Sequence, residues 1–350
     1  MKKQLIAIVL GSAFMLTSNN ALSYIKTDGS GIGQNGGGNE VAQAKGAGCS
    51  PATAQLTMEF NDVSSFIEQG GSMWQNRGVG VAAYEIPKGS GLKVIYAGAL
   101  WMGGTDINGQ LKIAALTFRN QEDFWPGPLS VTLGSGTYDP SQQVGDDIIR
   151  DFGAATIESE ECQAYDKFYT IRKAEVIAYV TWWECDYGIL PPTSCTEVIQ
   201  PSAEVMNRIN NWPAHGDASK FQDHYLAPFY DNDTGDTGAD GNYDPENGDY
   251  PWYDDILGKD DVECGFDRRV TLFGDETHWW VFNDAGNIHG ETQGEPIGME
   301  VRAQAFAFAT NDEVNRMTFY NYELINRGTQ TLYDTYFSQY IDADVGNYND

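Results

Sequence analysis

Positive charge is scarce in this sequence. Its 350 residues include 21 Lys and Arg against 50 Asp and Glu, which gives a formal net charge of −29. A protein with this balance repels phosphate groups, so the composition argues against nucleic acid and anionic membranes as partners. It favours cations as ligands instead.

Long hydrophobic runs are scarce as well. The longest apolar-rich stretch, Leu5 to Leu16, follows two lysines and precedes the tripeptide ALS at 21–23. A membrane span needs about 20 apolar residues, so this pattern predicts a signal peptide at residues 1–23 rather than a transmembrane helix. We therefore expect an exported protein, extracellular or on the outer cell surface, with no membrane insertion.

Catalytic signatures are missing from the sequence. The four histidines lack a zinc spacing such as HExxH, and no GxSxG elbow or P-loop occurs. The glycine run of the leader lacks the strand and helix that a phosphate-binding or dinucleotide-binding site requires. The 50 carboxylates allow many pairs of the kind that hydrolyse glycosides, but their abundance singles out none of them. No residue is predicted to be catalytic.

One stretch concentrates the negative charge. Residues 231–255, DNDTGDTGADGNYDPENGDYPWYDD, contain eight Asp, one Glu and no Lys or Arg. Glycines let the backbone turn so that carboxylates converge, and Ca²⁺ prefers such oxygen ligands. We expect a calcium site, although the spacing matches an EF-hand loop only in part; the alternative is a solvated acidic loop without a metal. The expected ligands are Asp231, Asp233, Asp236, Asp240, Asn242, Asp244 and Asp249.

A second group of carboxylates lies at the end of the sequence. Asp342 and Asp344 alternate along IDADVGNYND, and Asp350 ends it. These residues are a second candidate calcium site, with further ligands expected beyond residue 350.

Aromatic residues adjoin the acidic stretch. Tyr250, Trp252 and Tyr253 are candidates for stacking on sugar rings, and the alternative is that they pack the acidic loop onto the body of the protein. Trp101 and Trp125 are expected in the core, because large aromatic side chains are mostly buried.

Five cysteines in an exported chain are candidates for disulfides. Cys185 and Cys195 flank DYGILPPTS, whose two prolines bend the chain, and they are the first expected pair. Cys162 with Cys264 is the second. Cys49 would then be unpaired, with a partner elsewhere.

The rest of the sequence predicts a β-rich protein. Aromatic residues reach 13%, which suits pleated, half-buried strands. A Gly-rich flexible leader is expected at 24–48 and a β-rich domain at 49–350, which either forms one core or divides into two packed sub-domains at about 49–215 and 216–350. Asn108-Gly109 between two apolar runs predicts a hairpin. A helix is expected at 202–211, whereas 167–183 fits a strand that enters a helix without periodicity settling it.

The strongest strand signals come late in the chain. Strands are expected at 278–282, 299–310, 316–326 and 331–341. Between 299 and 309 one face carries Met, Val and Ala, and such small side chains indicate close packing against a second sheet. The predicted fold is mainly β, an antiparallel β-sandwich-like domain with a few short helices and long calcium-binding loops.

Several phrases carry a resemblance to a known family. They are AGALWMGGTDINGQLKIAALTFR (97–119), DFWPGPL (123–129), YDPENGDYPWYD (243–254) and LFGDETHWWVFNDAGNIH (272–289). In these motifs the chain resembles the amino-terminal region of large Bacteroidota surface proteins exported by the type IX secretion system. The resemblance implies further β modules and a carboxy-terminal sorting domain beyond residue 350. It implies a location and no particular activity.

The sequence thus predicts a non-catalytic, extracellular, calcium-stabilised β module of a large cell-surface or secreted protein, with a structural or adhesive role. Its expected partners are other modules of the same chain, other surface proteins, or glycans. A carbohydrate-binding module and a polysaccharide-active hydrolase are the alternatives.

Overall fold

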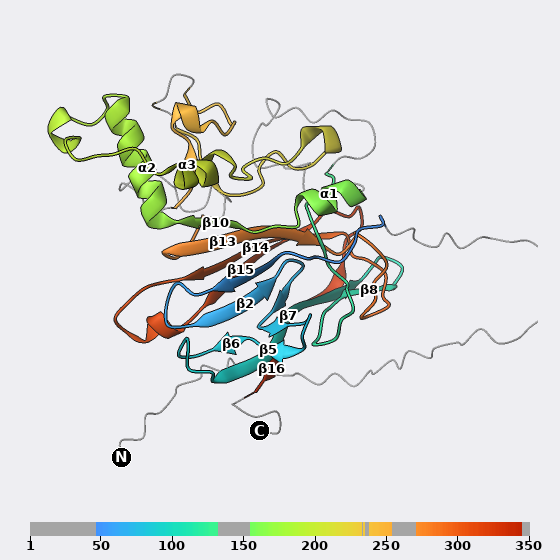
Figure 1. Cartoon of the computed structure of the whole chain (residues 1–350). Helices are drawn as coiled ribbons and strands as arrows, with labels where there is room; N and C mark the ends of the chain where they lie inside the picture. Colours follow the sequence, from blue (N-terminus) through green and yellow to red (C-terminus); the bar gives the residue numbers. More distant parts are fainter. Residues whose placement is uncertain (1–46, 132–154, 233, 235–237, 254–270, 345–350) are drawn as a thin grey trace, which may run out of the picture. The chain divides into compact units, whose positions relative to one another are not determined.

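The structure is a computed structural model that describes residues 47–131, 155–232, 234, 238–253 and 271–344. Residues 44–350 form one compact unit. Within it, two antiparallel sheets lie one above the other, and helices and loops cover the upper sheet (Figure 1). The mainly β, antiparallel fold with few short helices is therefore confirmed.

The larger sheet is built around one long strand, β7. The hairpin predicted at Asn108-Gly109 connects β7 to β8, and β16 pairs along almost the whole length of β7. Strands β6, β3 and β8 take successive segments of the other edge of β7. The strands of this sheet are β1 (Gln55–Met58), β2 (Ser64–Glu68), β3 (Ser72–Met73), β6 (Tyr84–Glu85), β7 (Lys93–Thr105), β8 (Leu111–Ala114) and β16 (Tyr333–Ala343).

The smaller sheet has the order β10-β13-β14-β15, and β9 pairs with β13. Its strands are β9 (Trp125–Pro126), β10 (Tyr169–Arg172), β13 (Glu276–Asn283), β14 (Met299–Ala307) and β15 (Phe319–Asn326). Two further two-stranded ribbons pair β4 (Gln75–Asn76) with β5 (Val81–Ala82) and β11 (Phe229–Tyr230) with β12 (Tyr250–Pro251).

The helices are short. Residues 169–186 form a strand that leads directly into a helix, and the helix predicted at 202–211 begins after Ser202, whose hydroxyl accepts a hydrogen bond from the main-chain N–H of Val205 at 3.3 Å. In the described part of the chain, no helix has the length and apolar character that a membrane crossing requires. The helices are α1 (Ser159–Ala164), α2 (Lys173–Asp186), α3 (Ala203–Asn210) and the 3₁₀ turns η2 (Pro192–Ser194), η3 (Ala218–Lys220), η4 (Pro245–Asn247) and η6 (Glu313–Arg316).

The core between the sheets follows from the alternation along β14. Ala303, Ala305 and the other small residues of one face are buried in a cluster with Met73 of the larger sheet. Small side chains allow the two sheets to approach closely, as the sequence predicted. Residues 299–307 therefore place the smaller sheet on the larger one as a sandwich.

The smaller sheet is also covered on its other face. Trp279 and Val281 of β13 belong to a second core with Val176 and Tyr179 of α2. All eight residues of β13 are buried, because side chains of both faces meet a packed layer. The helix and loop layer seen above the sheets in Figure 1 is thus part of the folded core.

Both sheets draw strands from both halves of the chain. β16 pairs with β7 in the larger sheet, and β10 pairs with β13 in the smaller one. The chain therefore does not divide into the two sub-domains at 49–215 and 216–350 that the sequence left open.

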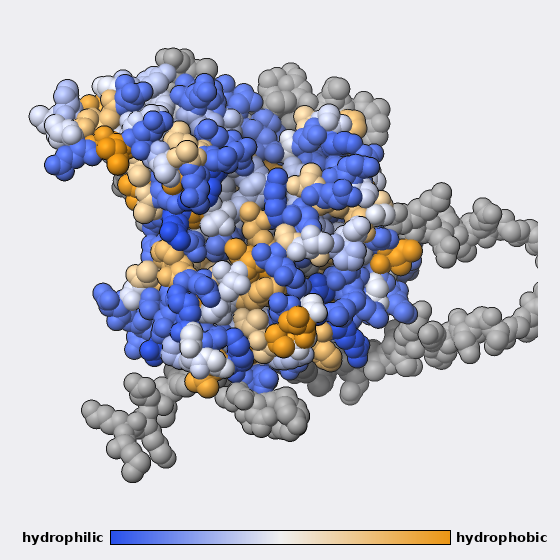
Figure 2. Space-filling model, viewed as in Figure 1, coloured by the Kyte–Doolittle hydropathy of each residue, from blue (hydrophilic) through white to orange (hydrophobic). Residues whose placement is uncertain are grey.

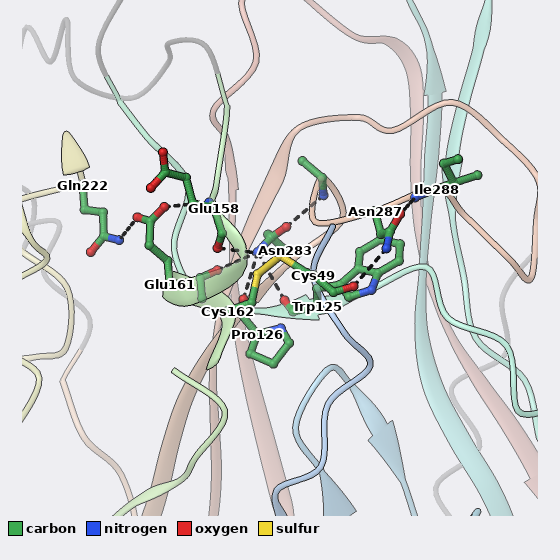
Figure 3. Close-up of a disulfide and its surroundings, with 12 residues drawn as sticks. Cys49, Trp125, Pro126, Glu158, Glu161, Cys162, Gln222, Asn283, Asn287 and Ile288 are labelled. Carbon is green, nitrogen blue, oxygen red and sulfur yellow. Dashed lines mark hydrogen bonds between the residues drawn. A yellow bond between two sulfur atoms is a disulfide. The ribbon is translucent and has the colours of Figure 1, made fainter. Parts of the chain in front are cut away.

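Two disulfides cross-link the described residues. Cys185 pairs with Cys195, as predicted. The predicted pair Cys162–Cys264 is wrong for Cys162, which bonds to Cys49 instead, so that Cys49 is not an unpaired cysteine (Figure 3). The N–H of Cys49 donates to Gly286 O at 3.1 Å, and Cys49, Cys162 of α1 and Ala285 belong to one small buried cluster, which brings the two cysteines together. Cys264 lies outside the described residues.

Candidate functional site

The acidic loop is closed at its base by two short strands. β11 precedes the loop and β12 follows it, and the two pair through Tyr230 with Tyr250 and Phe229 with Pro251. The rings of Tyr230 and Tyr250 stack at 4.9 Å. The two ends of the loop are therefore held together, which brings its early and late carboxylates into one place.

Asp249 is the centre of the loop. Its side chain is 1% exposed, and its two carboxylate oxygens accept hydrogen bonds from the main-chain N–H groups of Asn232 at 2.8 Å and Asp244 at 2.7 Å. Burial raises the pKa of Asp249 to about 6; the nearby charges of Asp231 and Asp244 add to the rise, and the two hydrogen bonds oppose it. The structure thus holds a buried acid beside two further acids.

The other carboxylates fold the loop by the same kind of contact. Asp231 accepts from the N–H of Gly241 at 2.6 Å, Asp240 from that of Asn242 at 2.8 Å, and Asp244 from that of Glu246 at 3.0 Å. Short polar side chains commonly stabilise turns in this way. A carboxylate oxygen that accepts one N–H keeps a second lone pair, which a cation can use.

Two histidines, His215 and His224, form hydrogen bonds with the main chain of the loop. His215 Nε2 accepts the N–H of Tyr243 at 2.8 Å, so His215 Nδ1 carries the proton and donates to His224 O at 2.6 Å. His224 Nε2 in turn lies 2.6 Å from Gly241 O, and the two imidazoles stack at 4.1 Å. Burial lowers the pKa of His215, in keeping with a neutral ring. Sequence reasoning missed this pair, because it searched the histidines for metal spacings alone.

Helix α2 supplies the wall against which the loop packs. Tyr179 donates its hydroxyl proton to Pro245 O, and the indole N–H of Trp183 donates to Glu246 O at 3.1 Å. Gly248 has φ +97°, and a Cβ there would lie 2.7 Å from the Trp183 ring, so glycine is required on both counts. The turn at 245–248 is therefore fixed to α2.

The aromatic residues beside the loop are buried. Tyr250, Trp252 and Tyr253 are 2%, 6% and 1% exposed, and Tyr253 lies in the core between the smaller sheet and α2. A sugar ring cannot reach them, so the prediction that they stack on glycans is wrong. They attach the loop to the body of the protein, which was the alternative.

The structure brings together part of the expected calcium ligands. Asp231, Asp240, Asn242, Asp244 and Asp249 lie in one closed loop. Asp233 and Asp236 lie outside the described residues. Within the described ranges, no three or more His, Cys, Asp or Glu side chains are arranged so as to hold a metal ion. Calcium binding by this loop stays a prediction.

The second group of carboxylates lies on the larger sheet. Asp342 is on β16 and accepts a long hydrogen bond of 3.4 Å from the hydroxyl of Tyr340. Asp344 follows the strand, and its buried Oδ1 has no hydrogen-bond partner among the described residues. Asp350 lies outside them. The calcium site predicted here also stays a prediction.

Comparison with known proteins adds no family to these observations. No family model matches the chain, and neither a curated protein nor a solved structure is similar to it.

Proposed function

We propose that this chain is a non-catalytic, extracellular β-sandwich module whose acidic loop at 231–249 binds calcium, and that it serves a structural or adhesive role in a cell-surface or secreted protein. The single observation that supports the calcium site is Asp249, a buried carboxylate that lies beside Asp231 and Asp244 in a stretch without Lys or Arg. The negative charges of these three carboxylates repel one another, and a bound cation would offset that repulsion.

Two features support the extracellular part of the proposal. Two disulfides indicate an oxidising environment, since thiols in the cytosol are kept reduced. The amino-terminal pattern of lysines followed by a short apolar run is that of a signal peptide. Type IX export remains part of the proposal, supported by the sequence motifs.

Thermal unfolding tests the calcium site. We expect the melting temperature to be higher in calcium chloride than in EDTA, with potassium chloride added to equalise ionic strength. A ligand at a hundred times its dissociation constant adds about 2.7 kcal/mol to the free energy of unfolding. Identical melting curves in calcium and EDTA would refute the proposal.

A matched pair of variants separates the metal from the turn that holds it. Asp244 and Asp217 each precede a 3₁₀ turn and accept a main-chain N–H two residues on, but Asp217 lies outside the acidic loop. Asp244→Asn should abolish the calcium response, whereas Asp217→Asn should keep it. Equal responses in the two variants would show that the effect of calcium does not arise at this loop.

A further inference from the structure

Trp101 is an exception within its strand. It is the one exposed residue of the thirteen in β7, with 37% of its surface accessible, although the sequence predicted a core position. Trp125, predicted in the same way, is 2% exposed. An exposed Trp ring loses the favourable free energy of burial, so its exposure on a strand with buried neighbours indicates a role at the surface rather than in the core.

Further aromatic rings lie beside Trp101. Tyr340 of β16 stacks on it with the ring planes 2° apart and the centroids 5.2 Å apart. Tyr336 is paired with Gly103, two residues along β7 from Trp101, and is 74% exposed. Cross-strand partners point to the same side of a sheet, so Tyr336, Trp101 and Tyr340 share one face. Gly103 has no side chain to cover Trp101 from that direction.

The loop after β8 continues this surface. The indole N–H of Trp101 donates to Leu116 O at 2.5 Å, and Phe118, two residues on, is 45% exposed. The Arg119 guanidinium lies 5.8 Å from the centre of the Phe118 ring. We call Trp101, Tyr336, Tyr340 and Phe118 the aromatic platform.

Charged groups surround the platform. Asp342 accepts from the Tyr340 hydroxyl, and Arg119 lies 3.7 Å from Glu291. The Glu291 side chain is 6% exposed, and its Oε2 has no hydrogen-bond partner among the described residues. This carboxylate is too buried to contact a ligand, so it contributes only its negative charge to the surroundings of the platform.

The size of the platform favours a small rigid ligand over a protein partner. From the exposed fractions, Trp101, Tyr336 and Phe118 together expose on the order of 350 Å². A stable protein interface buries about 800 Å² on each partner. On the face drawn in Figure 2, hydrophobic residues are interspersed with hydrophilic ones.

The chemistry of the platform indicates the class of ligand. A pyranose ring has an apolar C–H face, which stacks on aromatic rings, and a rim of hydroxyl groups, which bond to carboxylates and guanidinium. Asp342, Glu291 and the net charge of −29 disfavour anionic glycans. We infer that the aromatic platform binds a neutral polysaccharide, with sugar rings on Trp101 and Tyr336 and hydroxyl groups bonded to Asp342 and Arg119.

This inference names a ligand for the adhesive role in the proposed function, on a surface remote in the sequence from the acidic loop. Native gel electrophoresis in gels that contain xylan, galactomannan or hydroxyethyl cellulose tests it, with polygalacturonate as the anionic comparison. We expect at least one neutral polysaccharide to retard the protein and polygalacturonate to leave its mobility unchanged. Retardation by none of the three, or by polygalacturonate alone, would overturn the inference.

Variants locate the binding. Trp101→Ala and Tyr336→Ala should each weaken binding at least about tenfold, as loss of an aromatic contact at the centre of a site does. Tyr336 is mostly exposed, so its variant should fold even if the loss of Trp101 disturbs β7. Tyr187→Ala, which removes an exposed ring that stacks on Trp183 of α2, is the matched control and should bind normally.

The inference would be contradicted if Tyr336→Ala bound the polysaccharide as well as the wild type does, or if Tyr187→Ala lost as much binding as Tyr336→Ala. Repeating the gels in EDTA distinguishes the two proposals. If the acidic loop does not bind calcium, the melting curves in calcium and EDTA are identical, but the polysaccharide still retards the protein. If the aromatic platform does not bind a polysaccharide, the protein is not retarded, but calcium still raises its melting temperature.

Discussion

The two disulfides should stabilise the protein to different degrees. Cys49 and Cys162 are 113 positions apart, whereas Cys185 and Cys195 are 10 apart. In the chain-entropy model a cross-link stabilises by restricting the unfolded chain, by about 5 kcal/mol for the long loop and about 3 kcal/mol for the short one. Cys49 and Cys162 are also buried at 1% and 3% exposure, so their removal loses packing as well.

Guanidinium unfolding of two double variants measures this difference. Cys49→Ala with Cys162→Ala should lose about 2 kcal/mol more than Cys185→Ala with Cys195→Ala. Loss of a cross-link expands the unfolded chain, so the dependence of the unfolding free energy on denaturant should be fitted separately for each variant. A loss in the short-loop variant that equals or exceeds that of the long-loop variant would refute the reasoning.

Three further substitutions test the core and the loop. Gly98→Ala should cost about 1–3 kcal/mol in denaturant unfolding, because a Cβ there would lie 2.3 Å from the Trp74 ring. Glu300→Gln should cost about 3–5 kcal/mol, because two buried guanidinium groups, those of Arg327 at 3.0 Å and Arg302 at 2.9 Å, both lose this carboxylate and keep Asp223; a loss below 1 kcal/mol, as for a surface ion pair, would contradict this. Burial lowers the pKa of His215 below 6.5, so as the pH falls below 6.5 the unfolded chain binds a proton before the folded protein does, and the free energy of unfolding decreases. In EDTA, His215→Gln should make this decrease less steep, by up to about 1.4 kcal/mol per pH unit. An unchanged pH dependence would show that His215 is not responsible for it.

The elements of the fold were largely predictable because their signals are local. Asn108-Gly109 specifies a hairpin by its turn geometry, and Ser202 marks the start of α3 by its hydroxyl. The alternation at 299–307 identified the inner face of the sandwich, since small residues recur at every second position. Each of these inferences needs only neighbours in the sequence.

The partners of these elements were not predictable, because pairing between distant segments leaves no local trace. Nothing around Cys49 indicates that its main chain will bond to Gly286 or that its side chain will share a buried cluster with Cys162. The exposure of Trp101 and the burial of Tyr250 have the same origin: composition says that aromatic rings are mostly buried, but only the packed layers decide which ones.

The acidic residues of the candidate site were predictable from the sequence, but the residues of other segments that hold the loop in place were not. The density of Asp at 231–255 identified the loop, and the base formed by β11 and β12 brings its carboxylates together. The supporting residues His215 and Trp183 come from segments whose own sequence shows no relation to an acidic loop. A histidine can be recognised as a support for a loop only when the hydrogen-bond partners of both its ring nitrogens are known.

The pairing of β16 with β7 has a consequence for how the chain is made. Gln339 and Ala99 are 240 positions apart, yet they are hydrogen-bonded across this pair. A ribosome or a translocation channel delivers the earlier strand long before the later one, so the growing polypeptide carries an open edge along the thirteen residues of β7 until β16 emerges. A chain cut before residue 333 lacks β16, so this edge of β7 is open to pairing with a strand of another chain.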